Sequence, residues 1–255
     1  EGNDNVTELL DGVAIVARST WQAFQAKQQL EVEWDTTLAS KDNDEQIFAL
    51  AQEIGAAPWP SDTESVSTGD VERQYEDSNT EVIESSYKFP YVAHACMEPM
   101  NCTAHYHSAS NSLDIWAPTR QPGITLNTME SVFDIPKEQV TLHQMRMGGS
   151  FGRRRFQDYS SEVTAIAKRF DVPIKLIWTR EDDLAHDQYR PGGVFAFKGA
   201  VSREGRVVAM QNHLIGPSIR GRAGSGTQLG NNEFPALNID NYRAAITLVD
   251  TNTPT

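Results

Sequence analysis

The sequence predicts an α+β fold with a mixed, largely antiparallel sheet. Segments with the two-residue alternation of strands and segments with helical periodicity alternate only in part, which argues against a regular parallel α/β order. Two long strand-like segments within residues 193–218 are separated by the turn sequence SREG, as in an antiparallel hairpin. The 255 residues are 39% hydrophobic and 22% charged, which is typical of a globular protein with a sizeable core.

Two helices are predicted in the first third of the chain. Ser19, followed three residues later by Gln22, matches a capping box at the start of the first helix. Asp42 is the expected cap of the second helix, and Gly55 is its expected end.

Extended segments and a connector surround these helices. Short apolar or alternating runs predict strands at residues 12–17 and 31–35. Residues 56–80 are rich in Pro, Ser, Thr, Asp and Gly, and we interpret them as a mobile connector on the surface.

From residue 81 onward, strands and helices follow one another closely. Expected strands lie within residues 81–94, 102–119, 138–145, 173–180, 193–218 and 241–249. Expected helices lie within residues 121–133, where Pro122 suits the first turn, and within residues 158–171. Thr179 precedes the acidic sequence REDD and is expected to cap a short helix with local salt bridges.

The acidic residues are concentrated in the first third of the chain. The net charge is −13, and residues 1–90 contain 19 Asp and Glu against 5 Lys and Arg, whereas residues 91–255 contain 16 against 17. General binders of nucleic acid or of anionic membranes carry basic surfaces, so both functions are unexpected. No apolar run approaches the ~20 residues of a membrane-spanning helix. Anion-binding chemistry is therefore expected after residue 90.

The sequence GGSFGRRR, between a predicted strand and a predicted helix, is the strongest candidate site. Gly148, Gly149 and Gly152 permit positive φ angles and a close approach of the backbone to a ligand. Successive backbone N–H groups and a helix start favour negative charge, and the guanidinium groups of Arg153–Arg155 suit bidentate bonds with phosphate. The alternative is a tight turn with three solvated arginines. The sequence matches neither the dinucleotide-binding nor the P-loop pattern.

Several other residues carry candidate chemistry beside an ordinary structural alternative. Glu98 lies among apolar residues and is either a tuned acid or base, or a structural carboxylate that accepts backbone hydrogen bonds. His105 and His107 share one face of a predicted strand, and without a third ligand they are expected to be exposed histidines rather than a zinc site. Cys96 and Cys102 are expected to be free thiols.

The polar, glycine-rich segment 218–232 is either a surface loop or a loop that orders over a ligand. In the second case Arg220 or Arg222 would supply charge. No serine-hydrolase elbow, zincin motif or C-x-x-C motif occurs.

Taken in order, six segments resemble the molybdopterin-binding large subunit of the xanthine dehydrogenase/aldehyde oxidase family. These segments are GVAIVARSTWQAFQAKQQLEVEWD, HACMEPMNCTA, WAPTRQP, GGSFGRR, PIKLIWTREDD and HDQYRP. The closest branch looks like the isoquinoline 1-oxidoreductase beta subunit and related membrane-associated aldehyde dehydrogenases. The resemblance covers roughly residues 12–36 and 81–215, and we expect the chain to be a piece of a longer polypeptide.

The resemblance implies three consecutive segments and one cofactor loop. Residues 1–40 look like the C-terminal part of an α/β hammerhead domain, residues 41–80 like a helix and connector, and residues 81–255 like an incomplete first molybdopterin-binding domain. The family's GGxFG loop presents backbone amides to the molybdenum centre. The residues thereby placed at the cofactor are Gly148, Gly149, Ser150, Phe151, Gly152 and Arg153. No residue matches the family's glutamate base, so no catalytic residue and no metal ligand is assigned in this chain.

The resemblance also implies a molybdenum oxidoreductase that oxidises aldehydes or N-heteroaromatics with oxygen from water. The implied cofactor is molybdopterin cytosine dinucleotide with molybdenum. A small partner subunit with [2Fe–2S] clusters would carry the electrons away, with a cytochrome as a conceivable acceptor, and the remainder of the polypeptide would complete the site. Related proteins are often exported folded, which implies the periplasm, with the cytoplasm as the alternative. The 255 residues alone are expected to be inactive.

Two positions depart from the xanthine-oxidising members. Arg154 and Arg155 stand where those members have a Lys-Glu whose carboxylate meets the purine, so purine substrates are not expected. Val92 and its neighbours offer no glutamine partner for the metal's oxo ligand, so the backbone of Phe151 and Gly152 would carry more of that role.

The residues alone leave two other functions open. The chain could be a non-catalytic anion- or nucleotide-binding module, in which Arg153–Arg155 hold phosphate without a redox metal. It could also be an interaction domain in which the loop is structural. Cofactor extraction from the native complex discriminates the redox function from both.

Overall fold

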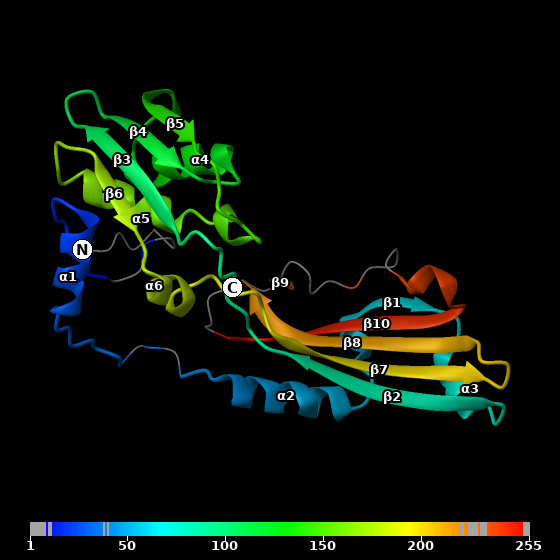
Figure 1. Ribbon diagram of the computed structural model, residues 1–255. Coiled ribbons are helices and arrows are strands. Elements are labelled where there is room, and N and C mark those ends of the chain that lie inside the picture. The colour runs from blue at the N-terminus through cyan, green and yellow to red at the C-terminus, as the bar shows by residue number, and fades with distance from the viewer. Residues whose placement is uncertain are drawn as a thin grey trace. The chain divides into compact units, whose positions relative to one another are not determined.

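The computed structural model of this chain describes residues 9, 12–37, 39, 41–219, 222–223, 229 and 234–251. The chain divides into two compact units, each with its own sheet (Figure 1). The first unit comprises residues 1–36 and 93–188, and the second comprises residues 37–92 and 189–255. Within the described part of the chain, every helix is too short or too polar to cross a membrane.

The first unit contains a four-stranded sheet in the order β5-β4-β3-β6. β3 pairs antiparallel with both β4 and β6, whereas β4 and β5 are parallel. The strands are β3 (Asn101–His107), β4 (Ser112–Ala117), β5 (Val140–Gln144) and β6 (Ile174–Ile177). The helices are α1 (Thr20–Gln28), α4 (Pro122–Phe133), α5 (Asp158–Ala167) and α6 (Arg180–Ala185), with 3-10 turns at Lys137–Gln139 and Arg153–Arg155.

The core of the first unit brings together the sheet, α4 and α5. Alternation along the strands turns Ala104 of β3 and Ile115 of β4 inward, and both side chains are fully buried. Tyr159 and Val163, which are four residues apart on α5, join the same cluster together with Met129 of α4. Full burial of an apolar side chain of this size contributes about 1.5–3 kcal/mol, so these contacts fix α5 on the sheet.

The second unit contains a longer sheet in the order β1-β10-β8-β7-β2, with β9 paired to β8. β8 and β10 are parallel, and the other pairs are antiparallel. The strands are β1 (Glu64–Thr68), β2 (Thr80–Phe89), β7 (Gly193–Ser202), β8 (Val207–Ile219), β9 (Arg222–Ala223) and β10 (Asn241–Val249). The helices are α2 (Asp44–Ala56) and α3 (Val71–Glu76), with 3-10 turns at Ser61–Thr63 and Ala236–Asn238.

Helix α2 runs along one face of this second sheet (Figure 1). Phe48 and Ala51 of α2 are buried against Val194, Ile215 and Val249 from three neighbouring strands. The apolar spacing of residues 42–55 predicts Ile47, Leu50, Ala51 and Ile54 on one helical face. Ala51 and Ile54 lie at this contact as predicted, but Leu50 is 44% exposed and Phe48 is buried there instead.

The α+β class and the largely antiparallel pairing are confirmed, but the chain forms two sheets where the sequence predicted one. The hairpin between β7 and β8 is present, and its turn is closed by the N–H of Gly205, which donates to Ser202 O. Thr179 caps α6 as predicted, in a reciprocal capping box with Asp182.

The strands predicted at residues 12–17 and 31–35 are wrong. Neither segment pairs with another strand among the described residues, and a strand without a ladder partner leaves its backbone groups unpaired. The side chains are correspondingly open, since Val13 and Trp34 are each more than half exposed.

The ends of α2 also differ from the prediction. Asn43, rather than Asp42, caps the helix, because its side chain accepts from Gln46 N at 2.9 Å. Gly55 lies within the helix, which ends one residue later at Ala56.

The predicted connector at residues 56–80 is structured, so that interpretation is wrong. Its SVST sequence forms part of β1, which pairs with β10 far along the chain, and Asp70 caps α3 by accepting from Arg73 N. Long-range pairing of this kind leaves little local signal, which is why composition alone indicated a linker.

The two units also differ from the three consecutive segments that were expected at residues 1–40, 41–80 and 81–255. Because β2 pairs with β7, residues up to Val92 belong with the second unit, while residues 93–188 form most of the first. The hammerhead assignment of residues 1–40 stays a prediction.

Candidate functional site

The glycine-rich loop lies between β5 and α5 within the first unit, as the sequence predicted. Its backbone is left-handed at Gly149, Phe151 and Gly152, with φ angles of +104°, +48° and +113°. Glycine adopts such angles without strain, whereas Phe151 is held there by its surroundings. A tight single turn follows at Arg153–Arg155 before α5 begins. The loop therefore has three left-handed residues between Gly149 and Gly152, whereas most residues of a protein have negative φ angles.

Glu98 fastens the start of this loop. Its Oε2 accepts from the N–H of Gly148 at 2.8 Å, and its own N–H donates to Gly148 O at 3.1 Å. A Cβ at position 148 would lie 2.4 Å from the Glu98 Cβ, so only glycine fits there. The structural alternative for Glu98 is thus what this structure shows.

Arg154 holds the loop from inside and is fully buried. Its Nε donates to Gly149 O at 2.8 Å, and one terminal nitrogen donates to both the backbone O and the Oε2 of Glu98, at 2.9 and 2.8 Å. One guanidinium thereby ties the loop to the segment before β3.

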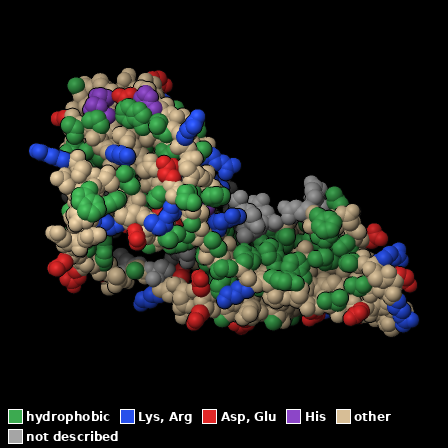
Figure 2. Space-filling model, in the orientation of Figure 1, with side chains coloured by type: hydrophobic (Ala, Val, Ile, Leu, Met, Phe, Trp, Pro, Cys, Tyr) green, Lys and Arg blue, Asp and Glu red, His purple; other side chains and the backbone are tan. Residues whose placement is uncertain are grey.

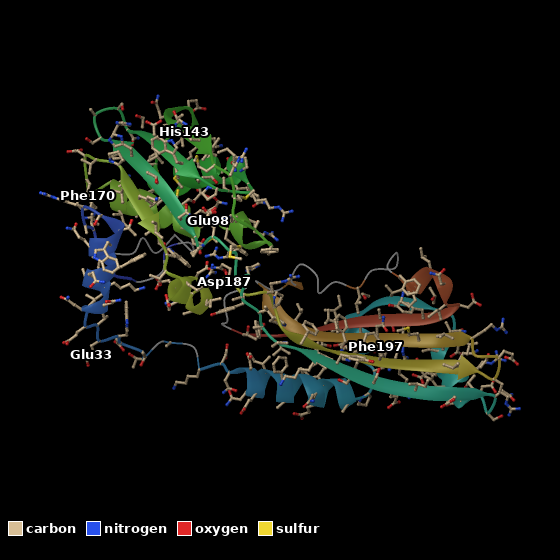
Figure 3. The ribbon with its side chains drawn as sticks, in the orientation of Figure 1. Glu33, Glu98, His143, Phe170, Asp187 and Phe197 are labelled. Carbon is tan, nitrogen blue, oxygen red and sulfur yellow. The ribbon has the colours of Figure 1, made fainter. Side chains whose placement is uncertain are left out.

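Arg153 is equally buried and is paired with two carboxylates. Its terminal nitrogens donate to the two oxygens of Asp158 at 2.9 and 2.6 Å, and its Nε lies 2.6 Å from Asp187 Oδ1. Burial acts to lower the pKa of Arg153, but the bonds and charges of these carboxylates outweigh burial and raise it. Asp187 and Glu98 are labelled in Figure 3.

The prediction that the side chains of Arg153 and Arg154 bind phosphate is therefore wrong. Their guanidinium groups face carboxylates and carbonyls of the protein, because a buried cation needs such partners. Arg155 is the exposed member of the three. The alternative of three solvated arginines is wrong as well. Whether Arg153 contributes to a cofactor in another way stays a prediction.

What the loop leaves open for a ligand is its backbone. Among the described residues, none accepts a hydrogen bond from the N–H groups of Gly149, Ser150, Phe151 or Gly152. The buried Ser150 Oγ also has no partner in that part of the chain. Unpaired backbone N–H groups in succession form a concavity that suits an anion. Of the predicted residues 148–153, Gly149 to Gly152 thus have backbone donors free for a negatively charged, oxygen-rich group, whereas the N–H groups of Gly148 and Arg153 bond to Glu98 and Ser150.

The remaining candidates have structural roles. His107 Nε2 and His143 Nε2 lie 3.0 and 3.3 Å from the two oxygens of Asp114, and these hydrogen bonds lower the pKa of Asp114. The ring of His105 lies beside that of His107, and the histidines form a purple group in Figure 2. No group of three ligands fit for a metal ion occurs among the described residues.

Both cysteines are free and buried, as predicted. Burial raises the pKa of the Cys102 thiol to about 12, so it stays neutral. The thiol of Cys96 donates to Ser150 O at 3.2 Å and so supports the loop.

Two further predictions concern polar segments. The salt bridge of α6 is confirmed, since Arg180 bonds Asp183 at 2.6 Å. Arg220 and the side chain of Arg222 lie outside the described residues.

His94 and Asp187 are site residues that sequence reasoning missed. His94 begins the HACMEPM segment, and Asp187 follows α6, so 93 positions separate two side chains that hydrogen-bond to each other. No spacing rule connects such distant positions, and only the fold brings them under the loop.

A glycine-rich loop with free backbone donors on a mixed α+β scaffold defines a protein that binds an anionic ligand. The sequence model of the molybdopterin cofactor-binding domain family matches residues 57–255. The chain belongs to this family.

Curated proteins are also similar to much of this chain. The membrane-bound aldehyde dehydrogenase of Gluconacetobacter polyoxogenes, whose name also carries pyrroloquinoline quinone, is 26% identical over 215 residues, which are 81% of this chain and 26% of that protein. The isoquinoline 1-oxidoreductase subunit beta of Brevundimonas diminuta is 24% identical, over 85% of this chain and 28% of the relative. Aldehyde oxidases and a xanthine dehydrogenase also match.

Solved structures share the fold. A CO dehydrogenase from Oligotropha carboxidovorans matches 94% of this chain and 32% of its own with a TM-score of 0.67 at 15% identity. Quinoline 2-oxidoreductase from Pseudomonas putida 86 matches 93% of this chain and 31% of its own, with a TM-score of 0.66 at 18% identity. The chain spans between about a quarter and a third of the length of these proteins.

Proposed function

We propose that this chain is the part of a molybdenum hydroxylase that holds a molybdopterin dinucleotide, with cytosine as the base, at residues 148–153. The observation that carries the proposal is the row of free N–H groups at Gly149–Gly152, beside the unpaired Ser150 Oγ. Donors that are already fixed in place bind an anion with little further loss of conformational entropy. Membership of the molybdopterin cofactor-binding family supports this choice of anion.

The residues of this chain have distinct tasks in the proposal. The N–H groups of the loop bind and orient the cofactor, while Glu98 and Arg154 hold the loop in its left-handed conformation. When bound, the molybdenum centre supplies hydroxylation of an aldehyde or an electron-poor N-heteroaromatic carbon, with oxygen from water. We assign no catalytic base within these 255 residues.

The proposal extends to the assembled enzyme. We propose a small subunit with [2Fe–2S] clusters as the electron outlet, a periplasmic location, and completion of the site by the rest of the polypeptide. The relative named as a subunit beta supports the partner subunit, and the small share of the relatives that this chain covers supports completion by the rest of the polypeptide. The periplasmic location rests on the family resemblance alone.

Metal and cofactor analysis of the intact complex tests the proposal. We expect about one molybdenum per large subunit, and release of a cytosine nucleotide when the denatured complex is hydrolysed. A nucleotide without molybdenum would favour the non-catalytic binding module. The absence of both would contradict the proposed function.

A further inference from the structure

His94 is anchored on one side by a buried carboxylate. Its side chain is 7% exposed, and its Nδ1 lies 3.3 and 3.4 Å from the two oxygens of Asp187. The backbone N–H of His94 donates to the same carboxylate. A carboxylate facing Nδ1 places the ring proton on that nitrogen, which fixes both the tautomer and the orientation of the ring.

The opposite nitrogen, Nε2, is turned toward the glycine-rich loop. A Cβ at position 152 would lie 3.0 Å from Nε2, so the ring lies directly against Gly152, and a larger residue there would require the ring to shift. Among the described residues, none forms a hydrogen bond with Nε2. The imidazole thus has one nitrogen committed to the protein and the other available beside the free N–H groups.

The anchor itself is rigid. Asp187 is 1% exposed and also pairs with the Nε of Arg153, whose other edge is held by Asp158. Both the imidazole and the turn that follows Gly152 are therefore attached to one buried carboxylate. A rotation of the His94 ring would cost its bonds with Asp187, so the position of Nε2 is fixed before any ligand arrives.

We propose that His94 is a cofactor-contacting residue, whose Nε2 accepts a hydrogen bond from a donor group of the bound molybdopterin beside Gly152, with Asp187 as its positioning residue. This inference rests on the proposed function of the loop. It accounts for a polar nitrogen that is directed at the loop although the fold itself uses only the opposite side of the ring.

Two substitutions at His94 separate this role from a purely structural one. In His94→Gln the side-chain amide reaches the position of Nε2, whereas in His94→Asn it reaches the position of Nδ1 and keeps the bond with Asp187. Both variants are made in the full-length polypeptide together with its partner subunit. Thermal unfolding checks that each variant folds, and molybdenum per subunit is measured over time after gel filtration.

We expect His94→Gln, which keeps the bond at the Nε2 position but not the one with Asp187, to lose molybdenum only a few-fold faster than the wild type. We expect His94→Asn to lose it roughly 10-fold faster, as for the loss of one strong hydrogen bond. The reverse order, with Asn retaining and Gln losing molybdenum, would show that His94 acts only through Asp187 and would overturn the proposal. Equal retention in both variants would overturn it too. If the wild-type complex itself contains no molybdenum, that result contradicts the proposed function, whatever the His94 variants do.

A second pair of variants tests the role of Asp187. Asp187→Asn and Asp158→Asn each weaken one side of Arg153, but only Asp187 contacts His94. We expect the first variant to lose molybdenum several-fold faster than the second at comparable thermal stability. Equal rates of molybdenum loss in the two variants would show that Asp187 acts only through its ion pair with Arg153, and would contradict its role in positioning His94.

Discussion

At the residue scale, the loop is built from charged side chains that serve the fold. Arg153 and Arg154 are adjacent and fully buried, yet they point into different partners, one into carboxylates and the other into the carbonyls of the loop. A buried guanidinium needs partners because desolvation costs several kcal/mol per ion, and Nη1 of Arg154 still lacks one among the described residues. The ligand-binding capacity of the loop thus lies in its N–H groups.

Arg154→Lys tests this division. An ammonium cannot reach Gly149 O, the backbone O of Glu98 and Glu98 Oε2 with the planar geometry of the guanidinium, so at least one of these acceptors is left unpaired. We expect the free energy of unfolding to fall by about 2–3 kcal/mol, measured by denaturant unfolding. The matched control is Arg155→Lys at the exposed neighbour, where a change within about 0.5 kcal/mol is expected. Similar losses in both variants would contradict the assignment.

At the element scale, polar contacts join α5 to the end of β6. Glu162 of α5 accepts from Trp178 Nε1 at 2.8 Å, and the residue following Trp178 caps α6. Desolvation raises the pKa of Glu162 to about 7, although the bond from Trp178 acts to lower it. A carboxyl group that titrates near neutrality inside a helix–strand contact makes this contact pH-dependent.

The direction of that dependence follows from proton linkage. Because the folded pKa lies above the unfolded value of 4.5, the folded state binds more protons between these values, and stability falls as pH rises from about 4.5 to about 7. The expected loss is up to about 3 kcal/mol. Glu162→Gln keeps an acceptor for Trp178 but cannot ionise, so its stability at pH 8 should exceed that of the wild type.

Denaturant unfolding between pH 4 and 8 measures this effect. The exposed substitution Glu138→Gln serves as the control and should follow the wild-type profile. A Glu162→Gln profile that parallels the wild type at every pH would contradict the linkage.

At the scale of the whole molecule, the chain crosses between the two units three times, after residues 36, 92 and 188. The complete loop region, from His94 to Asp187, lies within the first unit, while the second unit is built from the segments on either side. The contacts described above that hold the loop all come from residues of the first unit.

Residues 1–255 produced alone test how much of the enzyme they contain. The chain spans about a third of the solved relatives, and we assign no base within it, so we expect no turnover of aldehydes or N-heteroaromatics. Steady-state assays with an artificial electron acceptor measure this, with the intact complex as the positive control. Measurable turnover by the segment alone would contradict the expectation.

Local signals allowed much of the secondary structure to be predicted. Pro122 in the first turn of α4 and Thr179 at the start of α6 act over three or four residues, and both are where the sequence indicated. β1 escaped prediction because its partner, β10, lies about 180 positions away. The partners of Arg153 and Arg154 escaped for the same reason, since Glu98 and Asp187 are distant in sequence.

The sequence by itself determined the class of fold, the position of the loop and, through its ordered motifs, the family. These depend on glycine conformations, apolar periodicity and helix capping, all of which are set by neighbouring residues. Only the tertiary structure decided which polar groups form hydrogen bonds or ion pairs with one another and which remain without a protein partner. Burial forces each charge to find a partner, and packing, which acts between residues far apart in the chain, selects that partner.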